Sequence, residues 1–382
     1  MKKQTMQAII LAAGKSSRFN TGNTKLSFTL CGQEMIAYPA KLLSAMNVPM
    51  TLVVGFQQET IKDIIKKYAI EKTTFVEQEK QLGTGHALMC SQHTWTEDHI
   101  LVLNGDIPLI THDVINALCT HHTTHDAAVS FITTYSSDNS AEGLGRVIKK
   151  DNTIEIIEAR NCTTEDFTQL PLNAGIYLFN RQFLETTLLS LTPNEKTGEI
   201  YITDLIKYAS DKKLTVTTIN ASFDNVRGVN TLKELWAAEH IKRSELLTYW
   251  MNKGVRFAAA LNVCLDLDIE IGAGTFIGTG AILLNGTRIG KNCIINAFSY
   301  ISNTTIHDNV EIKPHSAICD SLIHQGCQVG PFAHLNKSII QDNVIIGNFI
   351  EVKNSTIGED KTIYFACLGG EMGSENSNHT VQ

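Results

Sequence analysis

Glycine, lysine, serine and arginine gather in one short segment, LAAGKSSR at residues 11–18, directly after an apolar run. A glycine-rich loop lets backbone N–H groups approach phosphate oxygens, and an arginine such as Arg18 adds a bidentate donor. Lys25 follows within one loop length. The segment matches neither the P-loop pattern nor the dinucleotide fingerprint. Alone, it indicates either a phosphate-binding loop or a polar loop at a strand end.

Further candidate segments follow along the chain. LNGDIPL at residues 103–109 ends an apolar run with Asp106, which would suit Mg²⁺ at the carboxyl edge of a sheet. QLGTGHA at residues 81–87 is a second glycine loop, in which we expect His86 to order the loop through a hydrogen bond rather than to act in catalysis. Four more segments continue the series: GLGR at 143–146, LNAG at 172–175, GEIYITD at 198–204 and VRGVN at 226–230.

Strand-like and helix-like segments alternate up to about residue 230, and these elements must position the loops. The pattern predicts an α/β fold with a doubly wound, mostly parallel sheet, whose ligands lie outside the carboxyl ends of the strands. Strands are expected at residues 7–14, 50–56, 74–78, 99–106 and 127–134, and helices at 34–46 and 58–69.

An amphipathic helix is predicted at residues 231–253, with Gly254 as its C-terminal cap. The apolar residues expected near one face of this helix are Leu232, Leu235, Trp236, Leu246, Leu247 and Trp250.

The period then changes to one aliphatic residue every six positions, with occasional steps of five. Such hexapeptide repeats specify a β-helix, because one aliphatic residue from each short strand points to its axis. Sixteen positions keep this step and predict about five coils: Ile271, Ile277, Leu283, Ile289, Ile295, Ile301, Ile306, Ile312, Ile318, Ile323, Val329, Leu335, Ile340, Ile346, Val352 and Ile357.

Composition excludes several classes of protein. The net charge of −7 argues against a nucleic-acid-binding surface, and no apolar window is long enough to predict a membrane span. Nine scattered cysteines, an odd number without a CxxC pair, fit the reducing cytoplasm. CTHHTTH at residues 119–125 has zinc-like spacing, but its position before a strand favours a solvated loop over a metal site.

The order of these motifs over nearly the whole chain resembles the bacterial bifunctional N-acetylglucosamine-1-phosphate uridyltransferase/glucosamine-1-phosphate acetyltransferase family. The resemblance implies a Rossmann-like nucleotidyltransferase domain at residues 1–230, a helical linker at 231–256, a left-handed parallel β-helix at 257–366 and a polar tail at 367–382. It also implies a cytoplasmic homotrimer that serves peptidoglycan and lipopolysaccharide precursor synthesis.

The first activity implied by the resemblance is transfer of UMP from UTP to N-acetylglucosamine 1-phosphate, with Mg²⁺ as cofactor. The attacking phosphate is already ionised, so the reaction needs positioning and charge neutralisation rather than a general base. By resemblance, Arg18 and Lys25 are catalytic, and Asp106 and Asn230 hold the metal. The implied substrate contacts are Leu11, Ala13, Gly14, Gln78, Gly83 and Thr84 for the nucleotide, and Gly145, Glu158 and Asn173 for the sugar phosphate.

The chain departs from the family pattern in both halves. Ser16-Ser17-Arg18 replaces Gly-Thr-Arg, and Ser16 is less free than glycine to adopt a positive φ. In the β-helix, Tyr364 replaces the histidine base of the acetyltransferase and Asn336 replaces a phosphate-binding arginine, although Lys353 remains. Since the family's later coils also do not follow residue 382, we expect no acetyltransferase activity.

Two other interpretations stay open at this point. One is a related sugar-1-phosphate nucleotidyltransferase that uses another sugar or nucleotide. The other is a trimeric scaffold that binds a nucleotide without turnover.

Overall fold

The computed structural model describes residues 5–19, 21–136, 143–150, 153–159, 170–364 and 367–369. The chain divides into two compact units, residues 1–239 and 240–382. Helix α8, Leu232–Asn252, contains the boundary between them and confirms the helix predicted at residues 231–253.

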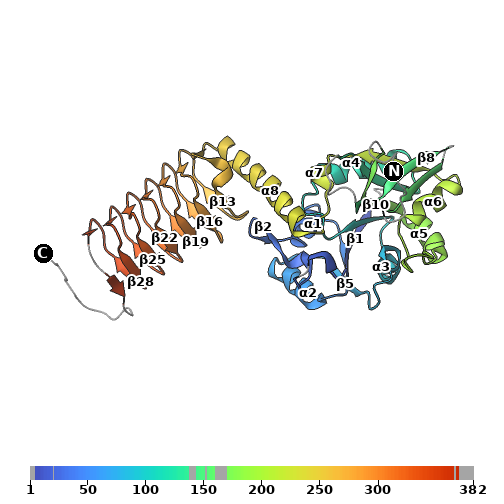
Figure 1. Cartoon of the computed structure of the whole chain (residues 1–382), viewed down its shortest axis with the longest axis horizontal. Coiled ribbons are helices and arrows are strands. Elements are labelled where there is room, and N and C mark those ends of the chain that lie inside the picture. The colour runs from blue at the N-terminus through green and yellow to red at the C-terminus, as the bar shows by residue number, and fades with distance from the viewer. Residues whose placement is uncertain are drawn as a thin grey trace. The chain divides into compact units, whose positions relative to one another are not determined.

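A central sheet forms the first unit (Figure 1). Its strands β1, β4, β5, β6 and β7 occur where apolar runs predicted them, whereas β8, β9, β10 and β11 were not predicted. Its main path runs in the order β11-β7-β10-β6-β1-β4-β5, and a hairpin of β8 and β9 adjoins β10. Strand β10 is antiparallel to both of its neighbours on this path, whereas the other pairs along it are parallel. The strands are β1 Met6–Ala12, β4 Met50–Val54, β5 Thr73–Glu77, β6 His99–Asn104, β7 Val129–Thr134, β8 Arg146–Lys150, β9 Thr153–Ile157, β10 Leu172–Asn180 and β11 Val216–Asn220.

Helices connect these strands, and two of them confirm the predictions at residues 34–46 and 58–69. Short strands β2, Thr29–Leu30, and β3, Gln33–Glu34, pair outside the main sheet. The helices are α1 Ala37–Ala45, α2 Gln58–Lys67, α3 Thr84–Ser91, α4 His112–Thr124, α5 Arg181–Thr187, α6 Asp204–Asp211 and α7 Phe223–Val226.

The alternation of strand β7 shows how the two faces of the sheet are covered. Val129 and Phe131 belong to a core that includes buried residues of α3, α5 and α6. Ser130 between them points to the opposite face, because successive side chains alternate across a strand, and there it meets His122 of α4. Helices therefore cover both faces, and the mostly parallel, doubly wound sheet is confirmed.

The segment at residues 119–125 is not the solvated loop that was expected. Helix α4 continues through Thr124, and His125 is its C-cap. The ring of His122 is fully buried, with Nδ1 2.8 Å from Ser130 Oγ and Nε2 3.1 Å from His99 Nδ1. The loop prediction is wrong because His122 lies on the same buried face of α4 as Ile115 and Leu118, so the helix continues through this segment.

Helix α8 differs from the continuous apolar face that was predicted for it. Leu247 is buried, and Leu246 and Trp250 pack partly buried against the core of the β-helix. Near the start of the helix, Leu232 and Trp236 are 50% and 60% exposed. The apolar residues thus serve mainly the second half of the helix. In the part of the chain that the structure describes, no helix has the length and apolarity needed to cross a bilayer.

The second unit is a left-handed parallel β-helix built from strands of two or three residues (Figure 1). All sixteen aliphatic positions predicted from the six-residue step are buried, none more than 7% exposed. Within the described residues, three parallel sheets of seven, seven and six strands form its sides. The strands of the first sheet are β12 Arg256–Phe257, β15 Phe276–Ile277, β18 Ile294–Ile295, β21 Glu311–Ile312, β24 Gln328–Val329, β27 Ile345–Ile346 and β30 Thr362–Ile363. The second sheet comprises β13 Cys264–Leu265, β16 Ile282–Leu284, β19 Tyr300–Ser302, β22 Ala317–Cys319, β25 His334–Asn336, β28 Glu351–Lys353 and β31 Cys367–Gly369. The third comprises β14 Glu270–Ile271, β17 Arg288–Ile289, β20 Thr305–Ile306, β23 Leu322–Ile323, β26 Ile339–Ile340 and β29 Thr356–Ile357.

Corners between the sheets place residues in the left-handed region of backbone space. Asparagine tolerates this region better than most residues, and Asn285, Asn303 and Asn309 adopt φ values of 54°, 46° and 59°. Another corner carries a stack of exposed rings, in which adjacent centroids lie 5.0–5.2 Å apart. The rings belong to Phe298, His315, Phe332 and Phe349.

Candidate active site

The loop after β1 brings the first candidate residues to the carboxyl edge of the sheet. Strand β1 ends at Ala12, and Gly14 is exposed with open space around it. Ser16 adopts φ 55°, a left-handed conformation. Serine adopts this conformation less freely than the glycine that the family has at this position. The Ser16 hydroxyl accepts a hydrogen bond from the Lys25 N–H at 2.9 Å. This bond connects Ser16 to the backbone of Lys25 across the loop.

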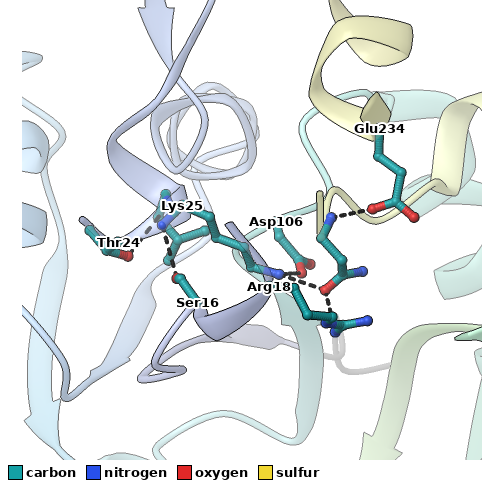
Figure 2. Close-up of polar contacts among 8 residues, drawn as sticks. Ser16, Arg18, Thr24, Lys25, Asp106 and Glu234 are labelled. Carbon is teal, nitrogen blue, oxygen red and sulfur yellow. Dashed lines mark hydrogen bonds and ion pairs between the residues drawn. The ribbon is translucent and has the colours of Figure 1, made fainter. Parts of the chain in front are cut away.

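Asp106 and Asn230 meet Lys25 at this edge (Figure 2). Strand β6 ends at Asn104, and the Val229 N–H donates to the Asp106 carbonyl at 2.9 Å, which joins the VRGVN segment to the strand end. The Lys25 ammonium forms an ion pair with Asp106 Oδ2 and donates to Asn230 Oδ1 at 2.8 Å.

Arg18 completes this group of four residues. Its guanidinium donates to the same Asn230 Oδ1 at 2.8 Å. Asp106 and Lys25 are largely enclosed, with side chains 13% and 16% exposed, whereas Arg18 is exposed. Two cations therefore converge on one amide oxygen beside one carboxylate, at the end of a sheet where nucleotides bind in related architectures.

These oxygens are suitable for a magnesium ion. A cation, the ammonium of Lys25, already lies between the Asp106 carboxylate and the Asn230 amide oxygen. Mg²⁺ is usually bound by one or two protein oxygens, with waters and substrate phosphates completing the octahedron. Among the described residues, no group of three or more histidine, cysteine or acidic side chains forms a metal cage. The carboxylate of Asp106 and the amide oxygen of Asn230 are the kinds of ligand that Mg²⁺ accepts from a protein.

Two residues that support the site were missed by the sequence reasoning. Glu234 Oε2 accepts a hydrogen bond from the Asn230 N–H at 2.6 Å (Figure 2). Gln57 Oε1 accepts one from the Thr24 N–H at 2.7 Å and so holds the segment before Lys25. The Thr231-x-x-Glu234 spacing of a capping box could have indicated Glu234, whereas no local pattern marks Gln57.

The second glycine loop is held against a later segment of the chain. Gly83 has φ 107°, and an added Cβ would lie 2.5 Å from the Ile200 carbonyl oxygen, so the position requires glycine. Buried Gln78 donates to the Gly83 carbonyl at 3.1 Å, and its Nε2 lies 3.0 Å from His86 Nδ1. His86 thus contacts the loop as predicted. Thr84 Oγ1 accepts from the N–H of Ile202 at 3.1 Å, within the GEIYITD segment.

The residues predicted to hold the sugar phosphate form a third group. The Asn173 N–H donates to the Gly145 carbonyl at 2.9 Å, and the Asn173 amide donates to the hydroxyl of Tyr177 at 2.7 Å. Glu158 accepts a hydrogen bond from the Thr203 hydroxyl at 2.8 Å. Burial and the Glu158 carboxylate raise the pKa of Tyr177, so the phenol stays protonated and available for hydrogen bonding.

Close backbone approaches join the three groups. Gly55 lies between the first two loops, since its added Cβ would be 3.0 Å from both the Ala13 Cβ and Gln81 Nε2. Gly175 has φ 73°, and its added Cβ would lie 2.9 Å from the Asn104 amide, two residues before Asp106. Leu11 also belongs to this edge, since its carbonyl accepts from the Gly105 N–H at 2.9 Å. These contacts bring the loop after β1, the second glycine loop and the start of β10 close to the carboxyl end of β6.

The β-helix positions singled out by the resemblance have different surroundings. Tyr364 is 67% exposed. Asn336 and Lys353 are register neighbours in the second β-helix sheet. The Lys353 ammonium lies 2.5 Å from Glu351 Oε1, and His334 Nδ1 lies 3.1 Å from the same oxygen. The Glu351 carboxylate is therefore paired with Lys353, the residue that still matches the family's phosphate-binding pattern.

Comparison of folds defines the class of the first unit. The MobA-like NTP transferase domain family matches residues 8–151, and the GMPPB C-terminal domain family matches residues 262–370. A crystal structure of a Bacillus anthracis protein assigned as a glucose-1-phosphate thymidylyltransferase superposes with a TM-score of 0.51 at 20% identity, over 63% of this chain and 96% of that one. A UDP-glucose pyrophosphorylase crystallised with UDP-glucose gives the same score at 17% identity, over 63% and 99%. The first unit has the fold of sugar-phosphate nucleotidyltransferases.

Curated proteins are similar to this chain over most of its length. The bifunctional protein GlmU of Clostridioides difficile is 35% identical over 304 residues, which are 78% of this chain and 65% of that protein. GlmU of Limosilactobacillus reuteri is 33% identical over 306 residues, 78% and 66% of the two chains. The chain is a homologue of the GlmU proteins, as its motifs predicted, and the alignments span about two thirds of the length of these relatives.

Proposed function

We propose that this protein transfers UMP from UTP to N-acetylglucosamine 1-phosphate, with release of pyrophosphate and formation of UDP-N-acetylglucosamine. The observation that carries the proposal is the convergence of Arg18 and Lys25 on Asn230 beside Asp106. The choice of uridine and of the acetylated sugar follows the family resemblance of the motifs, and the similarity to the GlmU proteins agrees with that resemblance.

The residues of the site are suited to this reaction without a general base. A phosphate oxygen of the sugar phosphate attacks the α-phosphorus of UTP, and the bond to the pyrophosphate oxygen breaks. Arg18 and Lys25 neutralise the negative charge that shifts onto the leaving pyrophosphate. Asp106 and Asn230 would hold Mg²⁺, which supplies further positive charge at the phosphates.

The other two groups orient the substrates. The Gln78–Gly83–Thr84 loop would hold the uridine together with Leu11, Ala13 and Gly14. Gly145, Glu158 and Asn173 would hold the sugar phosphate. Such positioning converts a bimolecular reaction into an effectively unimolecular one.

For the β-helix, we propose a structural and oligomerising role in a cytoplasmic homotrimer, without acetyl transfer. Tyr364 presents a phenol at the position where the family has its histidine base. Asn336 lacks the charge of the arginine that the family has at this position, and Lys353 is paired with Glu351.

The proposal is tested by pyrophosphate release over a panel of substrates. UTP, dTTP, ATP, CTP and GTP are each combined with N-acetylglucosamine 1-phosphate and with glucose 1-phosphate. We expect the highest kcat/KM for UTP with the acetylated sugar. A preference for another pair would indicate a related nucleotidyltransferase, and tight UTP binding without turnover for any pair would indicate a scaffold.

A further inference from the structure

The backbone of Asn230 is fixed from two directions. On its N-terminal side, the Val229 N–H donates to the Asp106 carbonyl at 2.9 Å. On the other side, the Asn230 N–H donates to Glu234 Oε2 at 2.6 Å (Figure 2). The main chain at Asn230 is thereby clamped between the end of β6 and the first turn of α8.

The side chain of Asn230 contacts both cations of the site. Asn230 Oδ1 accepts hydrogen bonds from both Arg18 and Lys25 at 2.8 Å. A rotation of the backbone at Asn230 would move this oxygen relative to both cations and to Asp106. The position of the oxygen therefore depends on the bond to Glu234. Within the described part of the chain, Glu234 forms no hydrogen bond or ion pair with Arg18, Lys25 or Asp106.

The hydrogen bond between the Asn230 N–H and Glu234 has a charged acceptor. Hydrogen bonds from a backbone N–H to a carboxylate are shorter and stronger than those between neutral groups. The Glu234 N–H in turn donates to Thr231 Oγ1 at 3.2 Å, as in a capping box. The carboxylate of this box reaches one residue further back than usual, to the N–H of Asn230 itself.

We propose that Glu234 is a positioning residue that sets the Asn230 amide oxygen for the divalent cation and the UTP phosphates. The identity of these ligands rests on the proposed function. Residues that orient a metal ligand commonly change metal affinity by about 10- to 100-fold when they are removed. We expect a loss of this size for Glu234→Ala.

The direct test is titration of the full chain with Mn²⁺, followed by electron paramagnetic resonance, with and without UTP. Glu234→Ala should weaken Mn²⁺ binding by about 10- to 100-fold. Glu234→Gln should restore most of the affinity, since its amide oxygen can accept the same hydrogen bond. In kinetics, Glu234→Ala should lower kcat and leave the KM for the sugar phosphate nearly unchanged.

Two variants separate positioning from helix capping. Thr231→Ala removes the other half of the cap and keeps the Asn230–Glu234 bond, and Lys233→Ala changes an exposed neighbour in the same turn. Both should bind Mn²⁺ as the wild type does. Wild-type affinity in Glu234→Ala, or an equal loss in Thr231→Ala, would overturn the proposal. Failure of the proposed function would show differently, as Mn²⁺ binding that responds to Glu234 without any nucleotide transfer.

Discussion

Lys25→Ala removes the cation that contacts both candidate metal ligands. One unit charge about 4 Å from a phosphate contributes about 4 kcal/mol at an effective dielectric constant of about 20. The side chain is 16% exposed, so solvent screens part of this energy. A remaining effect of about 2–4 kcal/mol on the transition state corresponds to a loss of about 30- to 1000-fold in kcat.

The same variant should affect metal binding in the opposite direction. Without UTP, the Lys25 ammonium occupies the oxygens of Asp106 and Asn230 that a divalent cation needs. Its removal should therefore tighten Mn²⁺ binding to the nucleotide-free protein, while kcat falls. Lys66→Ala, an equal loss of charge at an exposed position of α2, is the matched control and should change neither quantity.

Steady-state kinetics and a Mn²⁺ titration of Lys25→Ala measure both effects. The reasoning would be refuted if only the KM for the sugar phosphate rose. Unchanged Mn²⁺ affinity would equally refute the competition between the ammonium and the metal.

Four further outcomes are expected. Arg18→Ala should lower kcat more than it raises the KM for the sugar phosphate, because its charge acts on the leaving pyrophosphate; a change confined to that KM would contradict this role. Gly83→Ala should destabilise the first unit by about 1–3 kcal/mol, because φ 107° is strained for alanine and the Ile200 carbonyl occupies the space of the added Cβ. Gly14→Ala is the control, because the space around Gly14 is open. Equal melting temperatures for the two variants would contradict this explanation. Burial lowers the pKa of His122 to about 3, so below pH 6.5 the unfolded chain binds more protons than the folded one and stability falls toward pH 3. His122→Gln should weaken this dependence in melting curves recorded from pH 7 to 4, and an identical slope would contradict the assignment. Neither the wild type nor Tyr364→His should release thiol from acetyl-CoA in the presence of glucosamine 1-phosphate, and such release by the wild type would disprove the proposed loss of acetyl transfer.

The β-helix could be predicted from the sequence because each of its short strands carries one buried aliphatic residue at a nearly constant spacing. The six-residue step placed all sixteen aliphatic side chains in the interior of the β-helix. Apolar runs located five strands of the central sheet, since a buried parallel strand needs little beyond an apolar segment and a following turn; strands β8, β9, β10 and β11 were not predicted. The glycine loops marked the carboxyl edge on which the candidate residues meet.

Other features depend on contacts between distant segments and leave no local pattern. Ser16 keeps a left-handed backbone that glycine would adopt more easily, with its hydroxyl bonded to the Lys25 N–H. Gln57 supports the same loop from the start of α2. The apolar residues of α8 suggested one continuous face, but Trp236 is exposed and Leu247 is buried, because only the second half of the helix packs on the β-helix core.

Asp106 and its neighbours are proposed to transfer a uridylyl group with the help of a divalent cation. The most direct measurement is the rate of UDP-N-acetylglucosamine formation from UTP, N-acetylglucosamine 1-phosphate and Mg²⁺, followed by chromatography for the wild type and for Asp106→Ala. We expect product from the wild type, no product in excess chelator, and a rate lower by about two orders of magnitude or more in the variant, since a bound metal stabilises the transition state by several kcal/mol. Equal rates for the two proteins, or product formation undiminished by chelator, would contradict this proposal.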